Sequence, residues 1–172
     1  MAWILMLAFA ALAAAVVAAA RRGLSALQDS HDEAWSTLES QLEKRHELMI
    51  RIVGLCSRLM KYERDTLDRV TTTGSAVIAA ARRRNMPALA AADKSYRIAA
   101  GALFTLASNY PQFGTSAAFS ALRERAATLE ARVDEKREQY NGAVSVLNFR
   151  CQAFPHRWVA RSMGLRPAPF LS

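Results

Sequence analysis

The sequence has little that could cross-link a chain or hold a structural metal ion. It contains two cysteines in 172 residues, which excludes a disulfide scaffold and a four-cysteine zinc site. Seven glycines and five prolines are too few for a linker-rich, collagen-like or low-complexity chain. Charge of either sign is absent from residues 1–20, which also lack proline and glycine. The length is that of one domain, preceded by a segment of different character.

The charge-free segment is long enough to cross a bilayer. Twenty helical residues rise about 1.5 Å each and span about 30 Å, roughly one hydrocarbon core. Arg21 and Arg22 end the segment. A cleaved signal peptide, cut after Ala18-Ala19-Ala20, is the alternative, but such peptides have a basic n-region and a shorter apolar region. We expect residues 1–22 to form an uncleaved transmembrane anchor.

From residue 24 onward, apolar side chains recur at spacings of three, four and seven, which marks one face of a helix. Asn85 and Pro87 favour a new helix start, and Pro111 with Gly114 favours a break. The pattern predicts four helices, at about 24–44, 47–83, 86–108 and 116–152. The predicted core consists of Trp35, Leu38, Leu42, Ile52, Leu59, Leu103, Leu106, Phe119, Leu122, Leu129, Val133, Tyr140 and Leu147.

A set of short motifs spread along the chain resembles the LemA family. The resemblance covers nearly the whole chain, although no single motif is specific by itself. One pair departs from the family pattern, because Ile50-Arg51 stand where the family usually has Pro-Asn, between helices one and two. The matching motifs include Ala34-Trp35, Arg45-His46-Glu47-Leu48, Tyr110-Pro111, Leu129-Glu130, Arg137, Tyr140-Asn141, Asn148, Phe154-Pro155 and Gly164-Leu165.

The resemblance implies an all-α protein, with an antiparallel up-and-down four-helix bundle over residues 24–152 behind a single membrane anchor. Residues 153–172 would add a short helix and a tail that contains prolines. The family has no defined catalytic chemistry. We expect the bacterial inner membrane, and the arginine pair after the apolar segment predicts an outside N-terminus and a cytoplasmic domain. A periplasmic domain is the alternative.

The sequence offers weak candidates for chemistry. Glu43 and His46 have the Glu-x-x-His spacing of di-iron helical bundles, but the second such motif is absent. Cys56 lies on the apolar face and reads as a small core residue, and Cys151 ends the last long helix. No phosphate-binding loop or nucleophile elbow is present. We therefore expect no catalysis, no metal and no cofactor.

The basic residues indicate binding surfaces rather than a catalytic site. Arg82-Arg83-Arg84 is the densest cluster, but no aromatic residue lies between Tyr62 and Tyr96 to stack on bases, so we do not expect nucleic-acid binding. Residues 24–43 carry five acids and no base, whereas residues 139–172 carry four arginines and no acid. We expect these two segments to be neighbours that attract each other.

The C-terminal tail is the candidate contact site, for a membrane surface or for a partner. Arginine beside tryptophan suits a membrane interface. The alternative is that Trp158 and Met163 plug the end of the bundle. The candidate contact residues are Arg157, Trp158, Arg161 and Arg166.

Two classes of function remain from the sequence. The first is a membrane-anchored scaffold or adaptor for a protein partner, and the second is a basic module that binds anionic lipid or nucleic acid. The single anchor and the helical domain favour the first. The sequence leaves the partner and the oligomeric state open.

Overall fold

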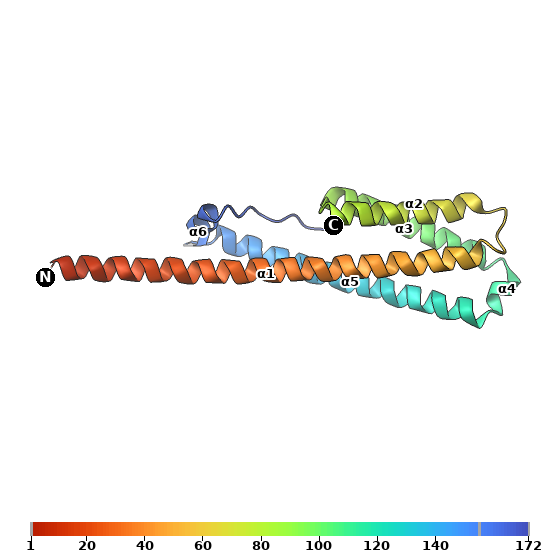
Figure 1. Ribbon diagram of the computed structural model, residues 1–172, viewed down its shortest axis with the longest axis horizontal. Coiled ribbons are helices and arrows are strands. Elements are labelled where there is room, and N and C mark those ends of the chain that lie inside the picture. The colour runs from red at the N-terminus through yellow and green to blue at the C-terminus, as the bar shows by residue number, and fades with distance from the viewer. Residues whose placement is uncertain (1, 155, 172) are drawn as a thin grey trace. The chain divides into compact units, whose positions relative to one another are not determined.

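The protein is built from α-helices. The computed structural model describes residues 2–154 and 156–171, and every regular element within these ranges is helical. This confirms the predicted all-α class and the long apolar helix at the N-terminus (Figure 1). The helices are α1 (Ala2–Cys56), α2 (Arg64–Arg82), α3 (Met86–Ala107), α4 (Pro111–Gly114), α5 (Ala117–Gln152) and α6 (His156–Ser162).

The chain divides into two compact units. Unit 1 combines Met1–Trp35 with Gln139–Phe170, and unit 2 combines Ser36–Glu138 with Leu171–Ser172. The long helices α1 and α5 therefore each contribute to both units. The apolar segment and α6 belong to unit 1, whereas α2, α3 and α4 belong to unit 2.

The core of unit 2 uses most of the apolar positions that the helical periodicity selects. Four predicted members are less buried than expected, because Leu59 is exposed and Leu106, Leu122 and Leu129 are only half-buried. In Figure 1, α2 and α3 lie side by side, and residues of these two helices pack together. The predicted core residues of unit 2 that are buried are Leu38, Leu42, Ile52, Leu103, Phe119 and Val133.

The predicted break near residue 45 is wrong, because α1 continues without interruption to Cys56. Arg45, Met49, Ile52 and Cys56 are all buried on one face of α1, so the same stripe continues through the expected break. Ile50-Arg51 contain no proline, and nothing at this point removes a backbone hydrogen bond.

The true connection between α1 and α2 is residues 57–63, which contain neither glycine nor proline. The amide N–H of Met60 donates to the Cys56 carbonyl at 2.8 Å, and the Met60 side chain turns into the core. Leu59 is consequently 45% exposed, although the helical periodicity predicts that it is buried.

The other helix boundaries of unit 2 follow recognisable local rules. Asn85 caps α3, since its side-chain oxygen accepts a hydrogen bond from the Ala88 amide at 3.1 Å, as predicted. Ser116 caps α5 by accepting from the Phe119 amide at 3.2 Å. Phe113 of α4 stacks on Phe119, with ring centroids 4.6 Å apart. These contacts close the end of unit 2 that carries α4.

Unit 1 has a small core of its own. Ala20 and Leu24 of α1 pack with Val159 and Ala160 of α6, and all four are buried. Farther along α1, Trp35 meets the Tyr140 ring edge-on, at a centroid distance of 5.4 Å. Trp35, Tyr140 and Leu147 are buried, as predicted. The beginning of the acidic segment thus packs against the basic C-terminal segment, while the attraction between them stays a prediction.

Candidate functional surfaces

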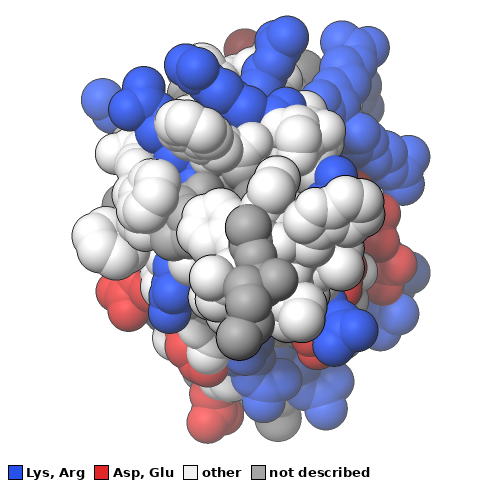
Figure 2. Space-filling model, turned by 90° about the vertical axis from the view of Figure 1, so that its left-hand side faces the viewer, with Lys and Arg blue, Asp and Glu red and all other residues white. Residues whose placement is uncertain are grey.

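The first part of α1 presents apolar side chains on all of its sides. Every residue from 3 to 19 is exposed, including Trp3, Leu7 and Phe9. By length and composition, α1 is the one helix within the described residues that could cross a membrane. Seen from the end where α1 begins, uncharged side chains occupy the middle of the view, and both basic and acidic side chains surround them (Figure 2). A core helix of a water-soluble domain would bury one face, and this segment buries none.

The C-terminal candidate residues all lie on the surface of unit 1. Arg157, Trp158 and Arg161 are exposed on α6, and Arg166 is exposed in the tail that follows. Trp158 is 73% exposed, so the alternative in which this side chain plugs the end of the bundle is wrong. The inward face of α6 belongs instead to Val159 and Ala160, with Met163 partly buried beside them.

The tail after α6 is held along α5. Gly164 adopts a positive φ of 71° and ends α6, with the Leu165 amide donating to the Ala160 carbonyl at 3.0 Å. The Asn148 side chain then makes two hydrogen bonds to the backbone of Ala168, at 2.8 and 2.9 Å. The Tyr140 hydroxyl donates to the Pro169 carbonyl at 3.1 Å. Residues 163–170 of the tail are therefore held within unit 1.

Unit 2 contains a group of alternating charges that links three helices. Asp93 of α3 lies at its centre and accepts from Arg45 of α1, from Arg97 at 2.9 Å and from Arg137 of α5 at 3.0 Å. Arg97 also pairs with Glu130 at 2.8 Å and with Asp134 at 2.6 Å. We call these six residues the ion network, and its three positive and three negative charges balance: Arg45, Arg97, Arg137, Asp93, Glu130 and Asp134.

Two members of the ion network are buried, Arg45 with 4% and Asp93 with 8% of its surface exposed. Burial by itself raises the pKa of Asp93, but the charges of Arg45 and Arg97 and their hydrogen bonds outweigh burial and hold this pKa below its ordinary value. The Asp93 carboxylate is therefore ionised at neutral pH. The Arg45 guanidinium also lies 4.3 Å from the centre of the Tyr96 ring.

An open cavity of about 340 Å³ lies beside the ion network, between α1, α3 and α5. Its walls are mainly apolar and include Leu48, Met49 and Phe104. The Arg123 guanidinium stands over the Phe104 ring at 5.9 Å from its centre. Small residues on the facing helices, among them Gly101 and Ala127, leave the space open. A cavity of this size can receive one or two bulky apolar side chains of another molecule.

The two residues with the Glu-x-x-His spacing each contact α2. Glu43 pairs with Arg82 at 3.3 Å, and His46 packs against Gly74 of α2. Within residues 2–154 and 156–171, no group of three His, Cys, Asp or Glu side chains is placed to hold a metal ion. Burial raises the pKa of the Cys56 thiol to about 11 and also raises that of Cys151, so both thiols are protonated at neutral pH.

A family model matches residues 34–172, which is most of the chain and includes all of unit 2. The chain belongs to the LemA family. A comparison with curated proteins found no match. The LemA match begins after the apolar segment, so the membrane assignment rests on the length, composition and exposure of that segment.

Several LemA-like positions of the sequence prove to be contact residues. Arg45 and Arg137 belong to the ion network, and Asn148 holds the tail. Sequence reasoning missed the role of Asp93. A signal was present, because Asp93 continues the spacing of Leu89, Tyr96 and Leu103 and so occupies a core position. A single acid on an apolar stripe predicts a buried cation nearby.

Proposed function

We propose that this LemA-family protein is a single-pass, membrane-anchored scaffold or adaptor that presents a helical domain to a protein partner and performs no catalysis. The observation that carries the proposal is the unbroken course of α1, from a segment exposed on all sides into the packed core of unit 2. The helix joins the apolar segment to this core without an intervening loop.

The contacts of unit 1 support retention of the anchor. Ala20 and Leu24 are both buried against α6, and the arginine pair lies between them. Cleavage after Ala20 would remove the Ala20 side chain from the small core and expose the residues of α6 that pack against it. An uncleaved span avoids this loss.

We further propose the topology that the charges predict, with the N-terminus outside and both units on the cytoplasmic side of the bacterial inner membrane. In this proposal, unit 2 is an antiparallel up-and-down bundle of four helical segments, from α1, α2, α3 and α5. The ion network, which links α1, α3 and α5, supports such a bundle.

The cavity between α1, α3 and α5 is our proposed docking point for the partner. Its apolar walls and its arginine at the edge suit an amphipathic segment that inserts an apolar side chain. In the alternative function, a basic module would bind anionic lipid or nucleic acid through its net charge of +8. Nucleic-acid binding through charge weakens steeply with salt, whereas a packed apolar contact does not.

The anchor can be tested by recovering the N-terminal peptide of the mature protein from membranes. We expect a peptide that begins before residue 21, in a protein that resists alkaline extraction. A mature N-terminus at Arg21 would disprove the anchor and would mean that the segment is a cleaved signal peptide of an exported domain.

The scaffold role can be tested by gentle detergent purification and mass spectrometry of the proteins that co-purify. We expect Ala127→Trp, which fills the cavity, to lose the partner. Ala131→Trp is the matched control, because Ala131 is exposed on the same helix one turn away. Equal recovery of the partner with both variants would rule out the cavity as the docking point.

A further inference from the structure

The helix α6 is attached to α1 at the end of the apolar segment. Val159 and Ala160 of α6 contact Ala20 and Leu24, which flank the arginine pair. If the apolar segment spans the hydrocarbon core, the residues that follow it stand at the level of the lipid phosphates. The packing within unit 1 therefore brings α6 to the membrane surface.

The exposed side of α6 carries two arginines one helical turn apart. Arg157 and Arg161 share a face, because residues four apart are neighbours on a helix. Both are exposed, and residues 139–172 contain no carboxylate side chain that could neutralise them. Guanidinium groups bind phosphate oxygens through paired hydrogen bonds.

These two arginines line an open cavity of about 450 Å³ between the end of α5, α6 and the tail. Gln152 of α5 and Leu165 of the tail form other parts of its wall. The tail is fixed by Asn148, so this wall keeps its position. A concave surface with two exposed guanidinium groups is suited to a phosphate group with a polar substituent.

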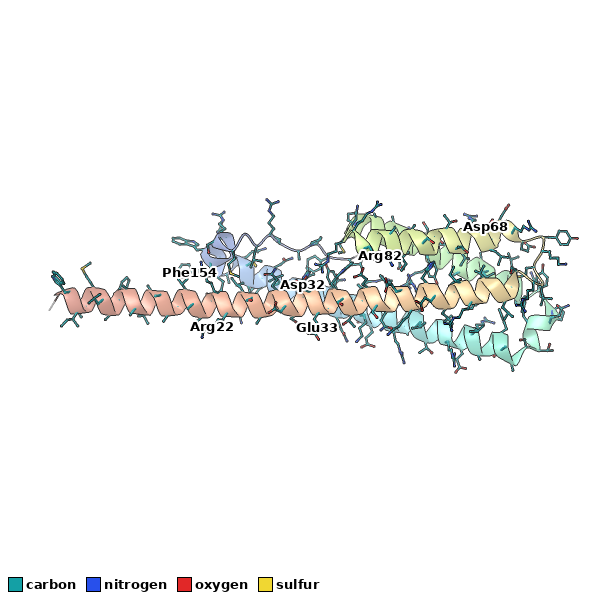
Figure 3. All side chains as sticks on the ribbon, in the orientation of Figure 1. Arg22, Asp32, Glu33, Asp68, Arg82 and Phe154 are labelled. Carbon is teal, nitrogen blue, oxygen red and sulfur yellow. The ribbon has the colours of Figure 1, made fainter. Side chains whose placement is uncertain are left out.

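Aromatic side chains stand exposed on the same part of the chain. Phe154 is 82% exposed and projects from the junction of α5 and α6 (Figure 3). Trp158 is exposed on α6 between the two arginines. Water-exposed aromatic rings of this size are unusual on a soluble surface, but tryptophan is enriched at membrane interfaces.

We propose that the cavity between α5, α6 and the tail binds the headgroup of an anionic phospholipid, with Arg157 and Arg161 on the phosphate and Trp158 and Phe154 in the interfacial layer. The proposal rests on the proposed membrane anchor, because α1 brings the cavity to the bilayer surface. It deepens the proposed function by making lipid a ligand of the domain.

The test uses the full-length protein in detergent, titrated with an equimolar mixture of phosphatidylglycerol and phosphatidylcholine and analysed by native mass spectrometry. We expect phosphatidylglycerol to be retained in preference to phosphatidylcholine. The double variant Arg157→Gln/Arg161→Gln should reduce the retention of phosphatidylglycerol by about thirtyfold, since each basic side chain at an anionic surface contributes roughly fivefold.

The matched control is Arg125→Gln/Arg132→Gln, which removes two exposed arginines from α5 in unit 2. This control should keep the preference for phosphatidylglycerol. An equal loss in both double variants would mean attraction to overall charge and would overturn the site. Displacement of the lipid by inorganic phosphate or by single-stranded RNA at similar concentration would overturn the choice of lipid.

Flotation with liposomes separates failure of this proposal from failure of the anchor. Wild-type protein that floats with neutral liposomes but lacks the preference for phosphatidylglycerol keeps its anchor and refutes the headgroup site. Wild-type protein that fails to float with any liposome refutes the anchor on which the site depends. Because both arginines are exposed, the double variant should keep the wild-type melting temperature. This measurement checks that the variant is folded.

Discussion

Arg45 of α1 and Asp93 of α3 are paired inside unit 2, at helix positions whose neighbours along the stripe are apolar. Arg45 falls between Leu42 and Met49 on its helix, and Asp93 follows Leu89 by one turn on the other. A shift of either helix by one turn would leave both charges buried against apolar side chains, at a cost of several kcal/mol. We infer that this pair fixes the register of α1 against α3.

The first prediction concerns removal of one partner of this pair. Asp93→Asn leaves Arg45 buried without its main counter-charge, so we expect the free energy of unfolding to fall by about 3 to 5 kcal/mol. Glu43→Gln breaks the exposed pair with Arg82 and should change stability by less than about 0.5 kcal/mol. Chemical denaturation of both variants provides the measurement.

The apolar double variant Arg45→Met/Asp93→Leu tests whether the buried pair stabilises the fold or only fixes the register of α1 against α3. It removes one charge of each sign, so the remaining members of the ion network stay balanced. We expect it to recover most of the stability that Asp93→Asn loses. A double variant that is as unstable as Asp93→Asn would show that the pair contributes net stability, and not only register.

The second prediction concerns the close approach of α2 to α1. A Cβ atom added at Gly74 would lie 2.6 Å from Nδ1 of His46, so Gly74→Ala forces the imidazole or the helix to move. We expect a loss of about 1 to 3 kcal/mol, although alanine is ordinarily the better helix former. Gly101→Ala on α3 meets no atom within 4 Å and should gain about 0.5 to 1 kcal/mol. If Gly74→Ala and Gly101→Ala changed the melting temperature equally, the close contact between Gly74 and His46 would be contradicted.

The third prediction concerns pH. Burial, and then the positive charge of Arg45, lower the pKa of His46 below its ordinary value, and Glu47 offsets this only in part. In the window between the lowered pKa and about 6.5, the unfolded chain binds the proton more tightly, so stability falls as the pH falls. The His46→Gln variant should lose less stability than wild type between pH 7.5 and 5.5. The free energy of unfolding is measured with urea at each pH. If it falls equally in wild type and in His46→Gln, His46 is not the group responsible for the pH dependence.

The periodicity of the sequence was sufficient to predict most of the helices and much of the core. Leu38, Leu103 and Val133 recur at helical spacing and are buried. The end of α1 could not be predicted, because residues 57–63 contain no glycine or proline and the chain turns there by backbone hydrogen bonds and burial of Met60. Tertiary packing determines this boundary, and local propensity does not.

The surfaces were predicted less completely than the fold. The sequence pointed to the arginines of the tail, whose exposure on α6 follows from the burial of Val159 and Ala160. It did not predict the ion network, because its members come from three helices and lie far apart in the sequence. Only Asp93 and Arg45 gave a local signal, as charges on apolar stripes.

The last prediction concerns the attachment of the tail by Asn148. Its amide group donates to the Ala168 carbonyl and accepts from the Ala168 amide, so one side chain satisfies both backbone groups as a paired strand would. In Asn148→Ala both hydrogen bonds are lost, and we expect the Ala168 amide to exchange with deuterium about tenfold faster or more, in line with a loss of one to two kcal/mol. Asn148→Asp keeps the acceptor but sets a carboxylate oxygen against the Ala168 carbonyl, so the tail should be released in this variant too. Ser145→Ala changes an exposed side chain of α5 one turn earlier and should leave the exchange rate unchanged. If the rate at Ala168 were the same in all variants, Tyr140 and the packing of α6 would hold the tail without Asn148.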